Sequence, residues 1–517
     1  MLFALLLLVG LPVLEVGSER TMTTTTIATP SAACVFTLLG EDKARPTISP
    51  LQCLDASYFP FQGWPNTTLA DVAARYHSTG ATMLRTHDYN YALDLANVYP
   101  DPTLPPDEPG AMSFVAADLA LDAILDAGFV PYLRVGNSGG WQPGGWQWSA
   151  HSDHWGTPNN TAAQHQNVAN AMARLVEHAS HRTQLKLGHA PLVAESWNEP
   201  NEPGFWNRAP PSWNMSLRFQ EFEDLFVLTV AALRDLRSRT RLNFIIGGPG
   251  FAVDCGADAC ASATTVSGQG VQLRPFLARV AARGARVDFV SWHRYSNVPA
   301  DFRDCTAAVV QAVHSTLGRS VAVHLSEWNL AGGKTTAGEP PVLNTTRGAA
   351  LLTSAWIAQQ LGGANLGCLY TGCCADFPYQ AGFPFGGGSG AALFTANPAR
   401  PLKPTALVIT RLWRPFAETY HRRLLLSTLP VDTPLYALGG STAHNTSSKR
   451  FGLLVSNPTN ETIVYRLQGS VCCEAAVIAS VEEVVDSSGE TRRRTVAVDA
   501  VTVGAWATQL LQISPQH

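Results

Sequence analysis

Residues 192–201 have the sequence LVAESWNEPN, and this stretch decides the fold that we expect. The apolar run at its start is typical of a buried strand near its end. Pro200 has no N–H to donate to a neighbouring strand, so the strand ladder stops and a loop begins there. In parallel α/β folds the carboxyl ends of the strands carry the chemistry. Glu199 is therefore predicted to lie at the functional edge of a parallel sheet.

A second stretch, residues 321–329 (VAVHLSEWN), repeats the pattern of a short apolar strand that runs into a glutamate. Strand alternation puts Glu327 on one face with Val321, Val323 and Leu325, so we predict that it stands above inward-facing apolar residues. A single glutamate at a strand end is most often a solvated surface group. Two such strand ends, each flanked by Trp and Asn, favour a catalytic pair of one proton donor and one nucleophile, as glycoside hydrolysis requires.

The composition indicates a well-packed globular protein. The chain has 517 residues, of which 46% are hydrophobic and 15% charged, enough for one large barrel with insertions and one small domain. The net charge is −4, and no basic run is long enough to suggest nucleic acid or an anionic membrane as the main partner. The oligomeric state is left open.

Three features favour a secreted protein. Residues 1–18 fit a signal peptide, although no Lys or Arg precedes its apolar core, and no other segment is predicted to span a membrane. The ten cysteines suit disulfides in an oxidising compartment. Zinc is the alternative, but neither a Cys-x-x-Cys pair nor a matching His spacing occurs, so we predict neither metal nor cofactor. Glycosylation sequons occur at Asn66, Asn159, Asn214, Asn344, Asn445 and Asn460.

Helical and strand patterns alternate through most of the chain, which predicts a closed (β/α)8 barrel over residues 41–415. Residues 19–40, rich in Thr, Ala and Ser, are predicted to form a flexible lead-in. Short β-like runs separated by turns predict an all-β, sandwich-like domain over residues 416–517. The eight predicted barrel strands are residues 47–55, 81–86, 129–135, 192–197, 242–247, 287–292, 321–325 and 365–370.

The motifs resemble those of the clan A retaining glycosidases, and they are most similar to glycoside hydrolase family 39, the β-xylosidase and α-L-iduronidase family. Besides the two glutamate stretches, the resemblance rests on LRTHD at residues 84–88 followed by YPD at 99–101, on FW at 205–206, and on FVSWHRY at 289–295. The pieces occur in the family's order. One departure is residues 370–374 (YTGCC) at the eighth strand, where a Trp is common in the clan; this puts the substrate in doubt more than the mechanism.

By this resemblance Glu199 is the acid/base and Glu327 the nucleophile. Asn198 is expected to contact the sugar 2-hydroxyl, which implies a bulge because adjacent strand residues face opposite ways; capping of the loop is the alternative. Arg85 is expected to keep Glu327 ionised, and Tyr295 to hydrogen-bond it unless the tyrosine only packs at the rim. The other expected sugar contacts are His87, Asp88, His293, Trp146 and Trp328, with surface salt bridging as the alternative for the charged ones.

Two further glutamates near the motif are predicted to be non-catalytic: Glu195 lies deeper, where a charge needs a partner, and Glu202 follows the strand. The sequence therefore predicts a secreted retaining glycosidase that acts on equatorial, β-xyloside-like bonds of a glycoside, oligosaccharide or polysaccharide. The alternative is a non-catalytic carbohydrate-binding or cell-surface glycoprotein on a barrel scaffold.

Overall fold

The structure is a computed structural model of residues 1–517. It describes the barrel, its covering helices and a C-terminal sheet. The described residues are 34–43, 47–49, 53–55, 69–87, 91–137, 162–201, 205–206, 215–253, 273–330, 342–372, 392–394, 402–429, 433–442, 450–468, 478–484, 491–497 and 501–513.

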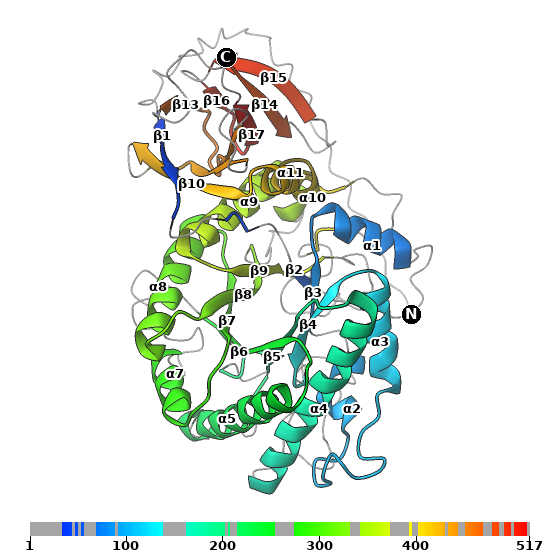
Figure 1. Ribbon diagram of the computed structural model, residues 1–517. Coiled ribbons are helices and arrows are strands. Elements are labelled where there is room, and N and C mark those ends of the chain that lie inside the picture. The colour runs from blue at the N-terminus through cyan, green and yellow to red at the C-terminus, as the bar shows by residue number, and fades with distance from the viewer. Residues whose placement is uncertain are drawn as a thin grey trace, which may run out of the picture.

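Eight parallel strands close into a barrel in chain order, β2 to β9, and helices surround it (Figure 1). This confirms the predicted (β/α)8 architecture. The strands are β2 Cys53–Asp55, β3 Met83–Thr86, β4 Val130–Val135, β5 Leu192–Ser196, β6 Phe244–Ala252, β7 Phe289–Tyr295, β8 Ala322–Asn329 and β9 Leu366–Leu369. The α-helices are α1 Leu69–Ser78, α2 Leu95–Val98, α3 Val115–Asp126, α4 Ala162–Leu187, α5 Met215–Arg239, α7 Leu273–Ala282, α8 Pro299–Leu317, α9 Thr346–Gly362, α10 Pro404–Val408 and α11 Arg414–Thr419.

The helix ends follow local sequence signals. At the start of α9 the Thr345 hydroxyl accepts a hydrogen bond from the Gly348 N–H (3.0 Å), and Gly363 after its end has a φ of 103°, which favours glycine. In the same way α8 begins at Pro299 and is followed by Gly318 with a φ of 63°. These signals fix where the chain leaves each helix to enter β8 or β9.

The inner face of β8 differs from the prediction. Val323 and Leu325 pack into the core shared with the surrounding helices, and it is His324 that faces the barrel interior, where its ring stacks on Phe289 (centroids 4.3 Å apart). The register against β7 then shifts, because Leu325 pairs with Trp292 but Glu327 pairs with His293. The extra residue at this bulge turns Glu327 toward the barrel mouth.

A disulfide joins the first and last barrel strands. Cys53 of β2 and Cys368 of β9 are bonded, and both are fully buried in a small cluster of interior residues that includes Tyr132 and Phe289. Because the two cysteines pair directly across the β2–β9 ladder, the bond lies at the point where the barrel closes. The disulfide predicted from the cysteine content is thus present in the described part of the chain.

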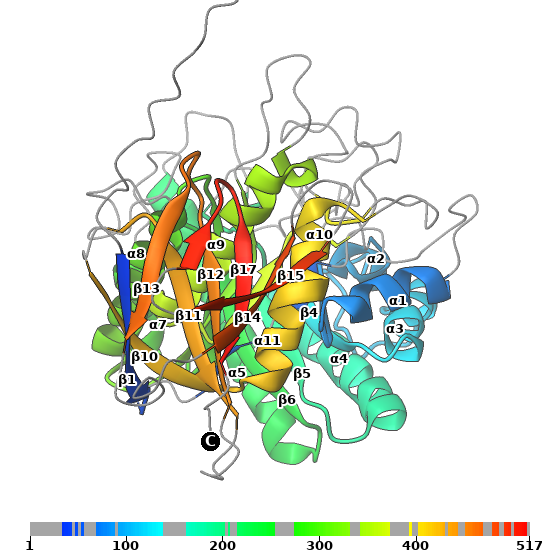
Figure 2. The ribbon, with the colours of Figure 1, turned by 90° about the horizontal axis from the view of Figure 1, so that it is seen from above.

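The C-terminal domain is one nine-stranded mixed sheet (Figure 2). It encloses a hydrophobic core of its own. It contains a strand that the sequence analysis placed in the flexible lead-in. That strand, β1 Cys34–Glu41, pairs antiparallel with β10 and parallel with β13. The other strands are β10 Arg422–Leu429, β11 Tyr436–Ser441, β12 Phe451–Ser456, β13 Ile463–Gln468, β14 Ile478–Val484, β15 Thr491–Ala497, β16 Val501–Val503 and β17 Thr508–Ile513.

The predicted flexible lead-in therefore needs correction at residues 34–40, which belong to β1. Phe36 and Leu38 of β1 are buried in the core of the C-terminal sheet. This burial stabilises β1, whose partner strands β10 and β13 are far away in the sequence. From Cys34 to Leu38, buried residues alternate with half-buried ones, as expected for a strand with one face in a hydrophobic core.

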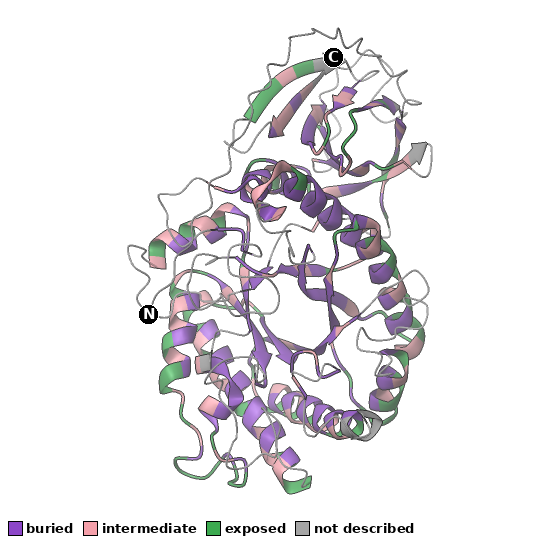
Figure 3. Cartoon of the chain, turned by 180° about the vertical axis from the view of Figure 1, so that it is seen from behind, coloured by how far each residue is buried: buried purple, intermediate pink, exposed green. Residues whose placement is uncertain are grey.

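The sheet packs against helix α9 of the barrel, and buried residues run continuously from the strands through this helix (Figure 3). The Ser456 hydroxyl donates to the carbonyl of Ala350 in α9 (2.8 Å), and the Arg347 guanidinium lies over the ring of Trp506 (5.1 Å to the centroid). One face of the sheet thus joins the barrel core through Leu438, Leu454 and Leu510, while its other face covers the separate core of the C-terminal domain. No helix in the described part of the chain is long and apolar enough to cross a bilayer.

His324 is expected to weaken the fold in acid. Burial lowers its pKa to about 4, while an unfolded histidine has a pKa of about 6.5. Between these values the unfolded chain binds more protons, so the stabilisation is present at pH 7 and is lost as the pH falls, by about 2 kcal/mol at pH 5. Urea unfolding of His324→Phe should show a smaller loss between pH 7 and pH 5 than the wild type, whereas the exposed His421→Phe should match the wild type. An unchanged acid loss in His324→Phe would exclude this residue as the cause.

Candidate active site

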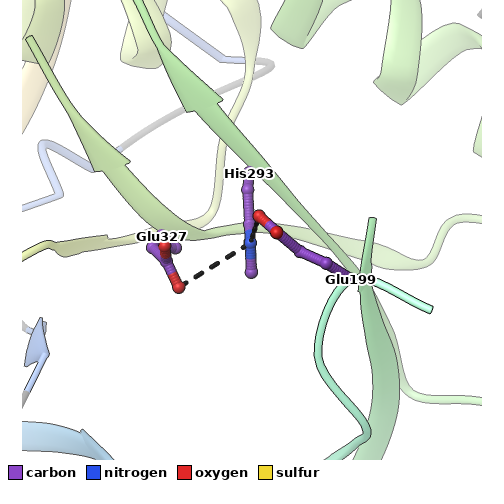
Figure 4. Close-up of side chains that lie close together, drawn as sticks. All are labelled: Glu199, His293 and Glu327. Atoms are coloured by element: carbon purple, nitrogen blue, oxygen red, sulfur yellow. Dashed lines mark hydrogen bonds and ion pairs between the residues drawn. The ribbon is translucent and has the colours of Figure 1, made fainter. Parts of the chain in front are cut away.

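Four strands spread around the barrel bring the two glutamates and their polar neighbours together at one end of it. β3 carries Arg85, the loop after β5 carries Glu199, β7 carries His293, and β8 carries Glu327. One carboxylate oxygen of each glutamate and the His293 Nδ1 all lie within 4.8 Å of one another (Figure 4). Glu327 is buried, and the Glu199 side chain is 15% exposed. The two carboxyl groups therefore face each other across a mostly buried space.

The loop after β5 turns sharply without the bulge that the sequence analysis expected. The β5 pairs with β4 and β6 run without a register shift, and the strand ends at Ser196. Trp197 and Glu199 then adopt positive φ values of 75° and 41°, which side chains other than glycine rarely take. This turn, and not a bulge, allows Asn198 and Glu199 to reach the same space.

Packing holds this unusual backbone in place. The Trp197 ring is fully buried against Trp206 (centroids 5.1 Å apart), and its Nε1 donates to the carbonyl of Phe205 (3.0 Å). The Glu199 N–H donates to the carbonyl of Gly250 (2.9 Å). Phe205 and Trp206, which the sequence analysis quoted as part of the family resemblance, thus anchor the loop that carries Glu199.

Arg85 is the hub of the site. A guanidinium has five N–H donors in a fixed plane, and all five of Arg85 have an acceptor within hydrogen-bond distance. Nε reaches Glu195 (2.7 Å), Nη1 reaches Asp55 (3.2 Å) and Glu327 (2.8 Å), and Nη2 reaches Asn198 (2.6 Å) and His293 Nε2 (3.3 Å). Burial opposes the charge, but Glu195, Glu327 and Asp55 together raise the pKa of Arg85 well above its ordinary value. Arg85 is therefore a fixed cation.

Each oxygen of Glu327 has its own donor. The Arg85 Nη1 contacts Oε2, and the Tyr295 hydroxyl donates to Oε1 (2.7 Å), so the hydrogen bond expected from Tyr295 is present. Burial, followed by the charge of Glu327, raises the pKa of Tyr295 well above its usual value. Tyr295 is consequently a neutral hydrogen-bond donor.

The contacts of His293 assign its proton. Arg85 has no acceptor atom, so the His293 Nε2 that faces it has to accept, and the proton of the neutral ring lies on Nδ1. Nδ1 donates to Glu199 Oε1 (2.7 Å) and lies 3.7 Å from Glu327 Oε2. A metal ion on Glu199, His293 and Glu327 would need the Nδ1 lone pair and would lie close to the Arg85 charge. The donor set is suitable for a metal, but its hydrogen bonding opposes one.

Of the other predicted sugar contacts, His87 lies in the site and Trp328 does not. His87 is buried, its Nε2 lies 3.8 Å from Glu327 Oε2, and burial lowers its pKa well below the usual value, so the ring is neutral. Trp328 does not join the site, because it follows Glu327 on the strand and its fully buried ring packs edge-on against Phe302 of α8. Asp88, Trp146 and Glu202 lie outside the described residues.

Two carboxylates in the site had no role in the sequence analysis. Glu195 was predicted to need a partner for its charge, and Arg85 is that partner. The same guanidinium also contacts Glu327, so Arg85 bridges the two glutamates. Asp55 of β2 lies on the other side of Arg85. The only sequence signal for Asp55 is that a carboxylate ends the first predicted barrel strand, residues 47–55.

Comparison with known proteins shows the fold. No protein-family model matches the chain, and no curated protein matches it. Among solved structures, it is similar to a glucosidase from Croceicoccus marinus (17% identity, 95% of this chain and 100% of that chain, TM-score 0.60). It is also similar to a family 39 β-xylosidase from Caulobacter crescentus (15% identity, 93% and 100%, TM-score 0.56) and to a family 86 enzyme in complex with neoagarooctaose (12% identity, 94% and 79%, TM-score 0.61).

These similarities cover nearly the whole chain at low identity. They show a fold shared with clan A glycoside hydrolases, and they include families 39, 86, 30 and 44 without separating one of them. The class of fold predicted from the motifs is thereby confirmed, whereas membership of family 39 stays a prediction.

Proposed function

We propose that the protein is a retaining glycoside hydrolase in which Glu199 is the acid/base and Glu327 the nucleophile. The observation that carries the proposal is the approach of the two carboxyl groups to within 4.8 Å at the mouth of the barrel. Retaining enzymes hold these groups about 5–5.5 Å apart, whereas inverting enzymes leave room for a water molecule at about 6.5–9.5 Å. The short separation supports direct attack by Glu327 on the sugar.

In the first step a Glu327 oxygen attacks the anomeric carbon, and Glu199 gives its proton to the departing glycosidic oxygen. Arg85 and Tyr295 hold the carboxylate of Glu327 in one orientation and stabilise its negative charge. Since His293 donates its Nδ1 proton to Glu199 Oε1, the catalytic proton of Glu199 belongs on Oε2. The products of this step are a glycosyl ester on Glu327 and the free leaving alcohol.

In the second step Glu199, now ionised, takes a proton from water as the water oxygen attacks the anomeric carbon. The ester bond to Glu327 breaks, and the sugar leaves with its original configuration. Asn198 supports sugar recognition, because its buried Nδ2 has no hydrogen-bond partner in the described structure while its Oδ1 is held by Arg85. A sugar hydroxyl, in particular the 2-hydroxyl, suits this vacant donor.

The resemblance to family 39 makes equatorial, β-xyloside-like substrates our proposal for the sugar. The test is hydrolysis of nitrophenyl β-glycosides of xylose, glucose, galactose and arabinose, with proton NMR of the first sugar anomer released. We expect the β-anomer first. Release of the α-anomer first would contradict the retaining mechanism, and binding of a polysaccharide with no cleavage of any glycoside would favour the non-catalytic carbohydrate-binding alternative.

Glu199→Ala is expected to remain reactive toward a glycoside with a good leaving group, because a dinitrophenolate departs without a proton. The ester on Glu327 should then accumulate, and added azide, which needs no general base, should accelerate turnover and yield the β-glycosyl azide. Product analysis by NMR gives the configuration. A failure of azide to accelerate this variant would show that Glu199 is not the acid/base.

Tyr295→Phe is expected to lower kcat about 10- to 100-fold and to change KM little, because a hydrogen bond to a charged group is lost where charge changes during the reaction. Steady-state kinetics on the best aryl glycoside provides the measurement. Tyr465→Phe is the matched control, since this buried tyrosine lies in the C-terminal sheet and its hydroxyl contacts Gln509. Equal kinetics for both variants would exclude a role of Tyr295 in the reaction.

We also propose that the protein is exported. The disulfide between Cys53 and Cys368 suits an oxidising compartment, and Asn460 of one predicted sequon is exposed in the turn between β12 and β13. N-terminal sequencing and a glycosidase-sensitive mass shift of protein secreted by a eukaryotic host would check this; retention of residues 1–18 would contradict it.

A further inference from the structure

Glu195 is buried below the two proposed catalytic carboxylates and takes no part in the reaction described above. It lies on β5, its side chain has no exposed surface, and its Oε2 accepts from the Arg85 Nε (2.7 Å). Its Oε1 lies 3.4 Å from the Tyr132 hydroxyl, which is itself 3.3 Å from His324 Nδ1. A chain of contacts thus runs from the barrel interior through Glu195 to Arg85.

The position of Glu195 on Nε decides where the rest of the guanidinium points. The guanidinium is planar, so a hydrogen bond that fixes the direction of the Nε–H also fixes the directions in which the two Nη groups donate. There Nη1 contacts Glu327 (2.8 Å) and Nη2 contacts Asn198 (2.6 Å). One carboxylate thereby orients the donors for the proposed nucleophile and for the proposed sugar-binding amide.

The charge of Glu195 also bears on Glu327. Burial alone would raise the pKa of Glu195, but the charge of Arg85 holds it below the usual value, so Glu195 is an anion that offsets part of the Arg85 charge. Without that anion, Arg85 would attract the electrons of Glu327 more strongly, and the nucleophile would be less basic. The titratable groups that face Glu195 or its partner are Arg85 on β3, Asp55 on β2, Tyr132 on β4, His293 on β7, and His324 and Glu327 on β8.

We propose that Glu195 is a positioning residue that acts through Arg85: it aims the guanidinium at Glu327 and Asn198 and moderates the charge that Glu327 experiences. This inference rests on the proposed function, because it assigns Glu327 as the nucleophile. It does not require any contact between Glu195 and the sugar.

The test compares Glu195→Gln with the wild type on the best aryl glycoside. The amide oxygen of glutamine can still accept from Nε, so the variant removes the charge and keeps the shape. We expect kcat to fall about 10- to 100-fold, KM to change less than threefold, and the acidic limb of the kcat/KM profile to move to lower pH by at least half a unit. Glu195→Asp, which restores the charge, should return the acidic limb toward that of the wild type.

Glu223→Gln is the matched control, because Glu223 is also a buried glutamate bonded to an arginine, Arg279 (2.9 Å), but lies on the outer helix α5. It should lose stability without a change in the pH profile. If Glu195→Gln behaves like this control, with a lower melting temperature and an unchanged acidic limb and kcat, Glu195 is only structural and the inference is wrong. A wild type that cleaves no glycoside would instead overturn the proposed function, and the inference with it.

Discussion

Replacement of Glu327 by alanine is expected to lower kcat/KM for aryl glycosides on the order of 10⁵-fold, because the variant has no nucleophile for the first step. The loss should appear in kcat even for a dinitrophenyl leaving group, which distinguishes this variant from Glu199→Ala. Stopped assays with long incubation provide the range needed. The fold should persist, since Arg85 keeps Asp55 and Glu195 as partners.

Azide gives this prediction a second readout. With Glu327 shortened to alanine, a small anion can enter from the face that the carboxylate occupied and attack the anomeric carbon directly. The product is then the α-glycosyl azide, the opposite configuration to that expected from Glu199→Ala. Glu461→Ala, at an exposed glutamate in the turn before β13, serves as the control and should retain full activity. If Glu327→Ala kept more than a few per cent of wild-type activity, the assignment of the nucleophile would be wrong.

Replacement of Arg85 by methionine is expected to cost about 3–5 kcal/mol of unfolding free energy, as the loss of one partner from a buried ion pair does. The change leaves Asp55, Glu195 and Glu327 buried together without the cation that contacts all three. Activity should be lost as well, because Glu327 and Asn198 lose their common donor. Urea unfolding monitored by tryptophan fluorescence measures the stability directly.

Two further measurements separate charge from packing in this variant. Arg85→Met combined with Glu195→Gln should be more stable than Arg85→Met alone, because one of the stranded charges is removed. The deficit of Arg85→Met should also shrink as the pH falls from 8 to 5: stranded carboxyl groups take up protons more readily in the folded state, which adds stability at low pH that is lost as the pH rises. A deficit that is independent of pH would point to lost packing of the arginine stem instead.

Much of the fold could be predicted because the signals were local. Most barrel strands contain a short apolar run, and the runs before Glu199 and Glu327 lead to the two carboxylates that meet in the structure. Arg85, His293 and Tyr295 lie at the ends of their strands for the same reason. Where the residues of a strand alternate regularly between its two faces, sequence position alone tells which of them face the same side of the sheet.

The errors have physical causes that alternation does not contain. The bulge between Leu325 and Glu327 in β8 placed Glu327 on a different face from Val323 and Leu325, and two positive φ values after β5 replaced the expected bulge near Asn198. The role of Glu195 depends on Arg85, a residue from a different strand, and no spacing within one motif reveals such a pair. Side-chain contacts between different strands depend on how the barrel closes, so the pattern within each strand could not predict them.

The strand β1 has a consequence for how the chain matures during synthesis. It leaves the ribosome before any barrel strand, yet Val35 pairs with Leu429 and Arg466, which are translated near the end. At about 5–20 residues per second, the first strand therefore waits tens of seconds for its neighbours. During that time its apolar side chains, Phe36 and Leu38, have no native cover and are available to chaperones. Residues 34–41 thus make completion of the C-terminal sheet depend on translation of nearly the whole chain.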